Sequence, residues 1–298
     1  MIYQNILQTI GNTPLIKINN IIKNKDIKVY AKIEGINPAG SIKDRIALRM
    51  LESAEAKGEL KTGKTIIEAS SGNTGIALAM IGAIKGYTVK IVMSEGVSVE
   101  RRKMIAAFGA EIILTAKEDG TDGARKKVDE IIKTEPNKYY HTDQFSNHSN
   151  ILAHYENTAR EIRQQSNGEI DYFVAAIGTS GTLMGVGQYL KKFNPNIKIV
   201  SAEPVEGHYI QGLKNMKEAL VPTIYDKSKL DDIIMIETKE AYAMSREIIR
   251  KEGIFVGMSA GAAMLAVKKV SEKIKSGNII TIFPDRGEKY LSTDLFCI

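Results

Sequence analysis

Cysteine is almost absent from this sequence. The single one among 298 residues is Cys297, at the position before the last. One cysteine excludes an internal disulfide and the paired CxxC ligands of a zinc site. The histidines do not fall in an HExxH-like spacing, so no metal site is predicted; they are His141, His148, His154 and His208.

Long hydrophobic runs are also missing. No apolar stretch reaches the length that spans a bilayer, and the N-terminus "MIYQNILQTIGNTPL" lacks a basic region followed by an apolar one. We therefore expect no membrane association and a cytoplasmic protein.

Tryptophan is absent, and the positive charge is not concentrated. The net charge is +6, but lysines are spread along the chain, and stretches such as "ARKKVDEIIK" mix both signs, as on a solvated helix face. Without a nucleic-acid motif, this pattern argues against a nucleic-acid partner. A mild positive excess suits small anionic substrates.

Short β-branched runs alternating with helical ones fill most of the chain. "IKVYAKIE" (27–34) has the period of a strand, and "TIIEA", "TVKIVM", "AEIILT", "DYFVAAI", "IKIVSAEP" and "ITIFP" are further strand candidates separated by helical segments. This alternation predicts an α/β protein with parallel-rich twisted sheets covered by helices.

The stretch "NPAGSIKDR" (37–45) places Lys43 in the first turn of a predicted helix, where the helix dipole disfavours its charge. An ammonium group destabilised in this way loses its proton more readily and becomes a nucleophilic amine, suited to an aldehyde cofactor. The alternative is a flexible side chain that turns out into water.

Two glycine-rich loops each follow a predicted strand and precede a predicted helix: "SSGNTG" (70–75) and "GTSGT" (178–182). Open backbone amides at such junctions form anion sites, so the two loops fit one phosphorylated cofactor and one carboxylate-bearing substrate. Both can also be tight turns without a ligand. "GMSAGAA" (257–263) places Ser259 at a further predicted strand-to-helix junction, where an ordinary N-cap is the alternative.

In their order along the chain, these segments resemble the cysteine synthase (O-acetylserine sulfhydrylase) and cystathionine β-synthase family of fold-type-II pyridoxal phosphate (PLP) enzymes. The resemblance also covers "IGNTPL", "SEGVSVERRKMIAAFGAEIILT", "DQF" and "PDRGEKYLST". It implies two domains: a smaller, mobile substrate-loop domain at 42–146, and a larger domain, formed by 1–41 and 147–298, that holds the cofactor phosphate. It also implies a homodimer.

The resemblance further implies roles for individual residues. Lys43 is the lysine that joins the cofactor aldehyde, Asn73 contacts the cofactor 3'-oxygen, and Ser259 faces the pyridine nitrogen. The phosphate loop consists of Gly178, Thr179, Ser180, Gly181 and Thr182, and the substrate carboxylate is bound by Ser70, Ser71, Thr74 and Gln144.

The implied activity is β-replacement: cysteine synthesis from O-acetylserine or O-phosphoserine and sulfide. The same chemistry starting from cysteine would release hydrogen sulfide and add water or a second thiol. A non-catalytic binding subunit is a further reading, against which the retention of Lys43, Asn73, Ser259 and both loops argues.

One long segment departs from the commonest branch of the family. "GLKNMKEALVPTIYD" (212–226) replaces a glycine-rich stretch, and in this it resembles the type-B cysteine synthases. Lys214 could meet an anionic group of the substrate, or it could be a surface lysine. The acids of "KLDDIIMIE" follow this segment. Asp232 is either solvated at a strand end or, if it points inward, the base that activates water in the second half-reaction.

Overall fold

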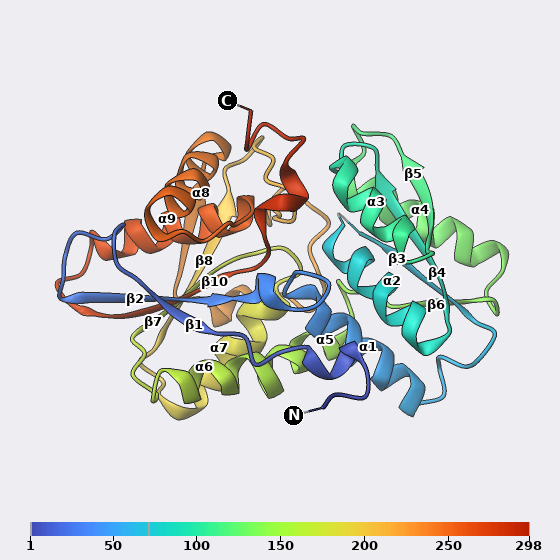
Figure 1. Cartoon of the computed structure of the whole chain (residues 1–298), viewed down its shortest axis with the longest axis horizontal. Coiled ribbons are helices and arrows are strands. Elements are labelled where there is room, and N and C mark those ends of the chain that lie inside the picture. Colours follow the sequence, from blue (N-terminus) through green and yellow to red (C-terminus); the bar gives the residue numbers. More distant parts are fainter. Residues whose placement is uncertain (1, 71, 298) are drawn as a thin grey trace.

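The computed structural model describes residues 2–70 and 72–297, and two sheets lie side by side in it (Figure 1). Within these residues, a six-stranded sheet has the order β1-β2-β10-β7-β8-β9 and a four-stranded sheet the order β5-β4-β3-β6. Only the β1–β2 pair is antiparallel among the pairings described. The predicted α/β class with parallel-rich sheets is confirmed.

The strands are β1 (Leu15–Ile18), β2 (Ile27–Ile33), β3 (Thr65–Ala69), β4 (Thr88–Ser94), β5 (Glu111–Thr115), β6 (Tyr139–His141), β7 (Tyr172–Ala176), β8 (Lys198–Pro204), β9 (Asp232–Ile236) and β10 (Gly277–Phe283). The α-helices are α1 (Lys43–Ala56), α2 (Asn73–Lys85), α3 (Val99–Ala107), α4 (Gly120–Thr134), α5 (His148–Ala153), α6 (Ala159–Gln165), α7 (Gly181–Phe193), α8 (Thr238–Glu252) and α9 (Met258–Ser271). A π-helical turn (His154–Thr158) joins α5 to α6.

Helices cover both faces of the six-stranded sheet. Successive residues of a strand face opposite sides, and in β10 Ile279 packs in one core cluster with Val267 of α9, whereas Ile280 packs in another with Leu190 of α7. Figure 1 shows α8 and α9 on one side of this sheet and α6 and α7 on the other. Both faces are therefore buried, as parallel sheets require.

The four-stranded sheet is covered in the same way. Helix α2 is apolar around most of its circumference, and its residues 74–82 are all buried between the sheet and α1. Helix α4 packs on β3, β4 and β5 with an amphipathic face, burying Ala124 and Val128. The strands of this sheet run from Thr65 to His141, inside the predicted range 42–146. The division into a smaller mobile and a larger domain stays a prediction.

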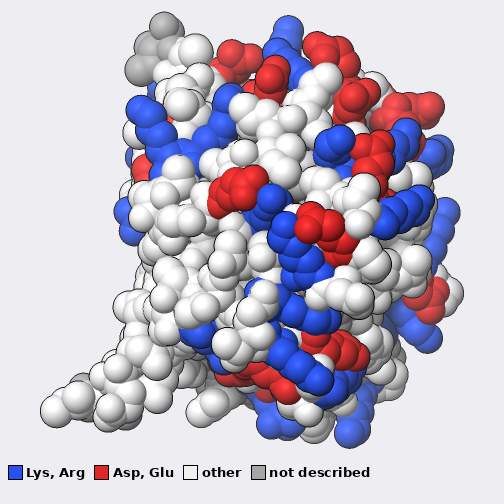
Figure 2. Space-filling view, turned by 90° about the vertical axis from the view of Figure 1, so that its right-hand side faces the viewer, with Lys and Arg blue, Asp and Glu red and all other residues white. Residues whose placement is uncertain are grey.

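Charged side chains of both signs are intermixed on the face of the molecule that carries the four-stranded sheet and its helices (Figure 2). None of the described helices combines the length and the apolar character needed to cross a membrane.

Candidate active site

A pocket opens where the carboxyl ends of strands from both sheets approach each other. It is lined by residues that follow β3, β6, β7 and β10, together with the start of α1, the start of α9 and the segment after β8. Ligand sites of open α/β sheets form at such strand ends. The lining includes Lys43, Asn73, Thr74, Gln144, Phe145, Gly178, Thr179, Ser180, Thr182, Gln211, Lys214, Ser259 and Tyr290.

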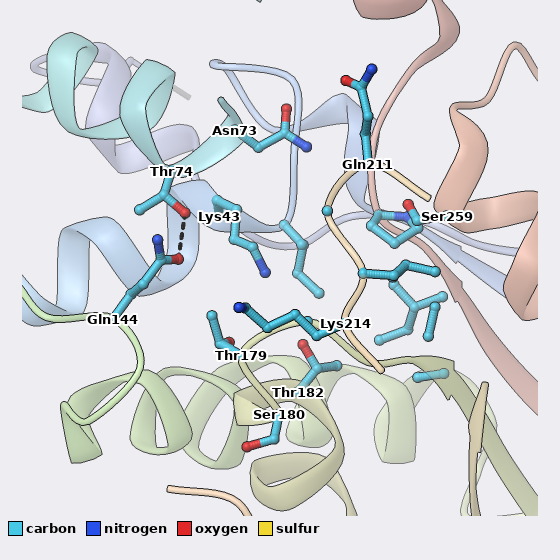
Figure 3. Close-up of a pocket in the computed structure, with 18 of the residues that line it drawn as sticks. Lys43, Asn73, Thr74, Gln144, Thr179, Ser180, Thr182, Gln211, Lys214 and Ser259 are labelled. Carbon is cyan, nitrogen blue, oxygen red and sulfur yellow. Dashed lines mark hydrogen bonds between the residues drawn. The ribbon is translucent and has the colours of Figure 1, made fainter. Parts of the chain in front are cut away.

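Lys43 is the first residue of α1, and its side chain points into this pocket (Figure 3). Burial lowers the pKa of its amine to about 8, and the negative charge of Asp285 offsets part of that shift. The helix start is held by short-range contacts: Ser41 Oγ accepts the Lys43 N–H at 3.2 Å, and Asp44 accepts the Ala39 N–H at 2.6 Å. The structure thus favours the inward-pointing, activated amine over the solvated lysine.

The loop "GTSGT" ends β7 and opens α7, as predicted. Ser180 has a left-handed backbone (φ 72°) directly before the helix, which makes successive N–H groups converge. A Cβ at Gly178 would lie 2.5 Å from the Gly212 carbonyl oxygen, and a Cβ at Gly181 would lie 2.0 Å from Asn150 Oδ1. Only glycine allows these two close approaches. The loop therefore requires glycine at both positions to form this anion cradle.

Side chains around this loop fix its threonines. Asn150 Nδ2 donates to Thr179 Oγ1 at 3.0 Å, and Thr182 Oγ1 lies 3.2 Å from Nε2 of the buried His154. Burial holds the pKa of His154 well below its usual range, so the ring is neutral. The side chain of Ser180 points away from Lys43 in Figure 3, and its contribution to an anion site is therefore its backbone.

On the opposite side of the pocket, Thr74 and Gln144 meet. Thr74 Oγ1 donates to Gln144 Oε1 at 2.7 Å, and Gln144 Nε2 donates to the Ala69 carbonyl at 2.9 Å. The Gln144 N–H donates to the buried Glu68 at 3.1 Å. These contacts hold a hydroxyl and an amide beside the N-terminus of α2, a setting that suits a carboxylate.

One of the described carboxylate ligands predicted from the sequence, Ser70, is not part of the pocket lining. Ser70 is buried beneath the loop, where its Oγ accepts the N–H groups of Gly72 and Gly75, both at 3.0 Å. Its hydroxyl thus organises the turn into α2, and its direct contact with the substrate carboxylate stays a prediction. Ser71 lies outside the described residues.

The sequence did not predict the hydrogen-bond network around Asn73. Asn73 Nδ2 donates to Asp285 Oδ2 at 2.7 Å, and Tyr290 Oη donates to the same oxygen at 2.5 Å. Lys289 Nζ donates to Asn73 Oδ1 at 3.2 Å. Asp285 follows the buried strand β10 at its carboxyl end, and that position was the signal that could have identified it.

Ser259 is the second residue of α9 and lines the pocket. The predicted strand before it is wrong, because α8 precedes this junction and Val256 forms only an isolated bridge with Arg286. The hydroxyl nevertheless lies on the pocket wall supplied by the six-stranded sheet, where it can face a bound ring.

Of the two remaining predicted residues, one lines the pocket and the other does not. Lys214 lines the pocket, and its Nζ donates to Asp122 of α4 at 2.8 Å. Asp232 does not line it. It begins β9, pairs in register with Val200 far from the strands' carboxyl ends, and its half-exposed carboxylate lies 3.5 Å from Lys273 Nζ. The inward-pointing base is therefore corrected: Asp232 is a surface residue, because β9 directs its first residue away from the pocket edge.

The residues of the pocket fit a phosphorylated aldehyde cofactor. The donor set has the required chemistry: converging amides at the start of α7 with the Thr179 and Thr182 hydroxyls for a phosphate, and a lysine amine with a lowered pKa for the aldehyde. Ser259, also in the pocket lining, would offer a neutral hydroxyl to a ring nitrogen. PLP can thus be held between Lys43 and the α7 loop.

Comparison with known proteins shows the family of the chain. The family model described as "Pyridoxal-phosphate dependent enzyme" matches residues 6–285. The chain is 46% identical to a cysteine synthase of Aquifex aeolicus, over 98% of this chain and 92% of that protein. It is 43% identical to cysteine synthase B of Escherichia coli, over 97% and 95%. A solved hydrogen sulfide-producing enzyme of Fusobacterium nucleatum has a TM-score of 0.92 and 43% identity, with 97% of this chain and 100% of that chain covered.

These matches extend over nearly the whole chain, and they contain the segments that build the pocket. Identity above 40% over almost the full length goes well beyond a shared fold. The protein therefore belongs to the pyridoxal-phosphate dependent enzymes, in the fold-type-II branch that includes the cysteine synthases, and its cofactor is pyridoxal 5'-phosphate.

Proposed function

We propose that this enzyme catalyses β-replacement on an activated L-serine, O-acetylserine or O-phosphoserine, and that sulfide is the nucleophile that yields cysteine. The observation that carries the proposal is the Lys43 amine. It points into the pocket with a pKa lowered to about 8, between an anion cradle at α7 and a carboxylate site at α2.

When bound, PLP supplies an electron-withdrawing ring that stabilises the charge developing at the substrate Cα. Lys43 takes the Cα proton as general base, a role that suits an amine whose pKa is lowered to about 8. The group on Cβ then departs, sulfide adds to Cβ, and Lys43 returns a proton to Cα.

The other roles follow from position. Thr74, Gln144 and the N-terminus of α2 orient the substrate carboxylate, and Glu68 supports Gln144 from behind. Ser259 is neutral beside the ring nitrogen, so the ring withdraws electrons less strongly than it would beside a carboxylate. That difference favours loss of a β-leaving group over transamination. Lys214 is the candidate contact for an anionic leaving group.

A second candidate activity is the cleavage of L-cysteine with release of hydrogen sulfide, followed by addition of water or a second thiol at Cβ. The similarity to a hydrogen sulfide-producing enzyme at 43% identity favours it as the alternative. Both activities use the same proton transfers at Cα, so the residues named above serve either one.

The test is to offer three substrate sets to the purified holoenzyme: O-acetylserine with sulfide, O-phosphoserine with sulfide, and cysteine alone. Mass spectrometry identifies the products. Cysteine as the fastest product supports the proposal, and faster production of sulfide and serine from cysteine supports the alternative. The homodimer and the cytoplasmic location stay predictions. Size-exclusion chromatography with light scattering tests whether the protein is a dimer.

A further inference from the structure

Helix α4 and the segment 212–220 meet at the mouth of the pocket, and Asp122 joins them. Its Oδ1 accepts from Lys214 Nζ at 2.8 Å, and its Oδ2 accepts the Leu220 N–H at 3.0 Å. Arg125, one turn along α4, donates to the Leu220 carbonyl at 3.1 Å. Because α4 packs on the four-stranded sheet and the segment follows β8 of the six-stranded sheet, Asp122 connects the two sides of the pocket.

Lys214 is held as part of the pocket wall. Its N–H donates to the Ile177 carbonyl at 3.0 Å, which anchors its backbone beside the "GTSGT" loop. Its side chain is 11% exposed, and its Nζ lies 5.2 Å from the centre of the Phe145 ring. Lys214, Lys43 and Thr179 line the same pocket (Figure 3). The ammonium is thus held in the wall of the pocket that the Lys43 side chain enters.

The charge of this ammonium is balanced by the carboxylate of Asp122, whose Oδ1 also lies 3.8 Å from the Arg125 guanidinium. Partial burial acts to raise the pKa of Asp122, but hydrogen bonds from Lys214 and the Leu220 N–H outweigh it and hold the pKa below its usual value. Asp122 is therefore ionised at neutral pH. An anionic group on the substrate would be attracted by Lys214 and repelled by Asp122, whereas an uncharged group would respond to neither charge.

We propose that Asp122 is a specificity-determining residue: by pairing with Lys214 it limits the preference of this pocket for an anionic leaving group over a neutral one. The inference rests on the proposed β-replacement activity and adds the residue that sets the substrate class. It predicts opposite effects for the two members of the pair. Loss of the Asp122 charge increases the preference for the substrate with the anionic leaving group. Loss of the Lys214 charge decreases that preference.

The experiment compares Asp122→Asn, Lys214→Met and the parent holoenzyme with O-phospho-L-serine and O-acetyl-L-serine, each with sulfide. Asparagine retains an oxygen that can accept the Leu220 N–H, so the segment keeps that anchor. We expect the ratio of kcat/KM for phosphoserine to that for acetylserine to rise about tenfold in Asp122→Asn, equivalent to about 1.4 kcal/mol, and to fall by a similar factor in Lys214→Met. The matched control is Glu130→Gln, which removes one negative charge from the exposed face of the same helix.

A binding measurement separates this inference from the proposed function. L-2-Amino-4-phosphonobutyrate carries a carbon in place of the ester oxygen of phosphoserine and cannot lose its phosphonate. Calorimetric titration of the holoenzymes should give about tenfold tighter binding in Asp122→Asn and weaker binding in Lys214→Met. If the parent enzyme turns over neither ester, the proposed function fails, and the phosphonate affinities still decide the role of Asp122. Equal affinities in all variants, an unchanged substrate ratio, or no phosphonate binding in any of them would overturn the inference.

Discussion

Asn73 Nδ2 and Asp285 Oδ2 form a 2.7 Å hydrogen bond between residues that follow strands of different sheets. Asn73 opens α2 after β3, and Asp285 follows β10. Tyr290 donates to the same carboxylate oxygen, and Lys289 donates to the Asn73 carbonyl oxygen, so the Asn73 amide is fixed at both ends. A carboxylate thereby orients the amide that we expect to contact the cofactor.

This network predicts that Asp285→Asn weakens cofactor binding. The substitution keeps the shape but removes the charged acceptor of the Asn73 amide and the Tyr290 hydroxyl. A hydrogen bond to a charged group is worth about 1.5–3 kcal/mol, so we expect the Kd for PLP to rise roughly ten- to a hundredfold. Equilibrium dialysis of the apo-protein measures it. Asp294→Asn, an exposed acid in the same segment, is the control; equal affinities for the two variants would exclude the orienting role of Asp285.

The pKa of Lys43 predicts how pH controls cofactor uptake by the apo-protein. Only the neutral amine attacks an aldehyde, and the pKa is lowered to about 8, so the rate of covalent uptake should rise with pH and reach half its maximum near pH 8. Asp285 favours the charged amine, so its neutralisation in Asp285→Asn should move the midpoint to lower pH. The yellow absorbance of lysine-bound cofactor follows the rate, and Lys43→Ala should show none. A midpoint near pH 10, as for a solvated lysine, would contradict the assignment.

The parts of this site that the sequence predicted correctly are those encoded by patterns of a few neighbouring residues. The "GTSGT" and "SSGNTG" loops were located because a strand, a glycine-rich turn and a helix succeed one another within a few residues, and these patterns are local. Asp285 and Asp122 were missed because their partners lie 212 and 92 residues away. Asp232 was misplaced for a related reason. The segment before it in sequence borders the pocket at Gly212 and Lys214, but the parallel register of β9 with β8 places Asp232 at the opposite edge of the sheet.

Ser259→Asp tests the neutral partner proposed for the ring nitrogen. A carboxylate at this position would favour a protonated nitrogen and a ring that withdraws electrons more strongly. We expect β-replacement to slow at least tenfold and keto-acid by-products from transamination to appear, detected by mass spectrometry. Ser259→Ala is the control, because it removes the hydroxyl without adding charge. If the Asp variant gave the same products and rates as the Ala variant, the result would contradict the position of Ser259 beside the ring nitrogen.

Asp232→Asn tests the corrected position of Asp232. Its side chain is 49% exposed, and its carboxylate lies 3.5 Å from Nζ of Lys273, whose side chain is 66% exposed. Exposed pairs of this kind contribute at most about 1 kcal/mol to stability. The structure therefore predicts unchanged rates of sulfide and serine formation from cysteine and little change in the free energy of unfolding. Lys273→Met should behave in the same way, since it removes the other partner of the pair. Slower serine formation in Asp232→Asn alone, with the substrate carbon diverted to pyruvate, would instead require that Asp232 reach the pocket and act as the base for water, against the register of β9.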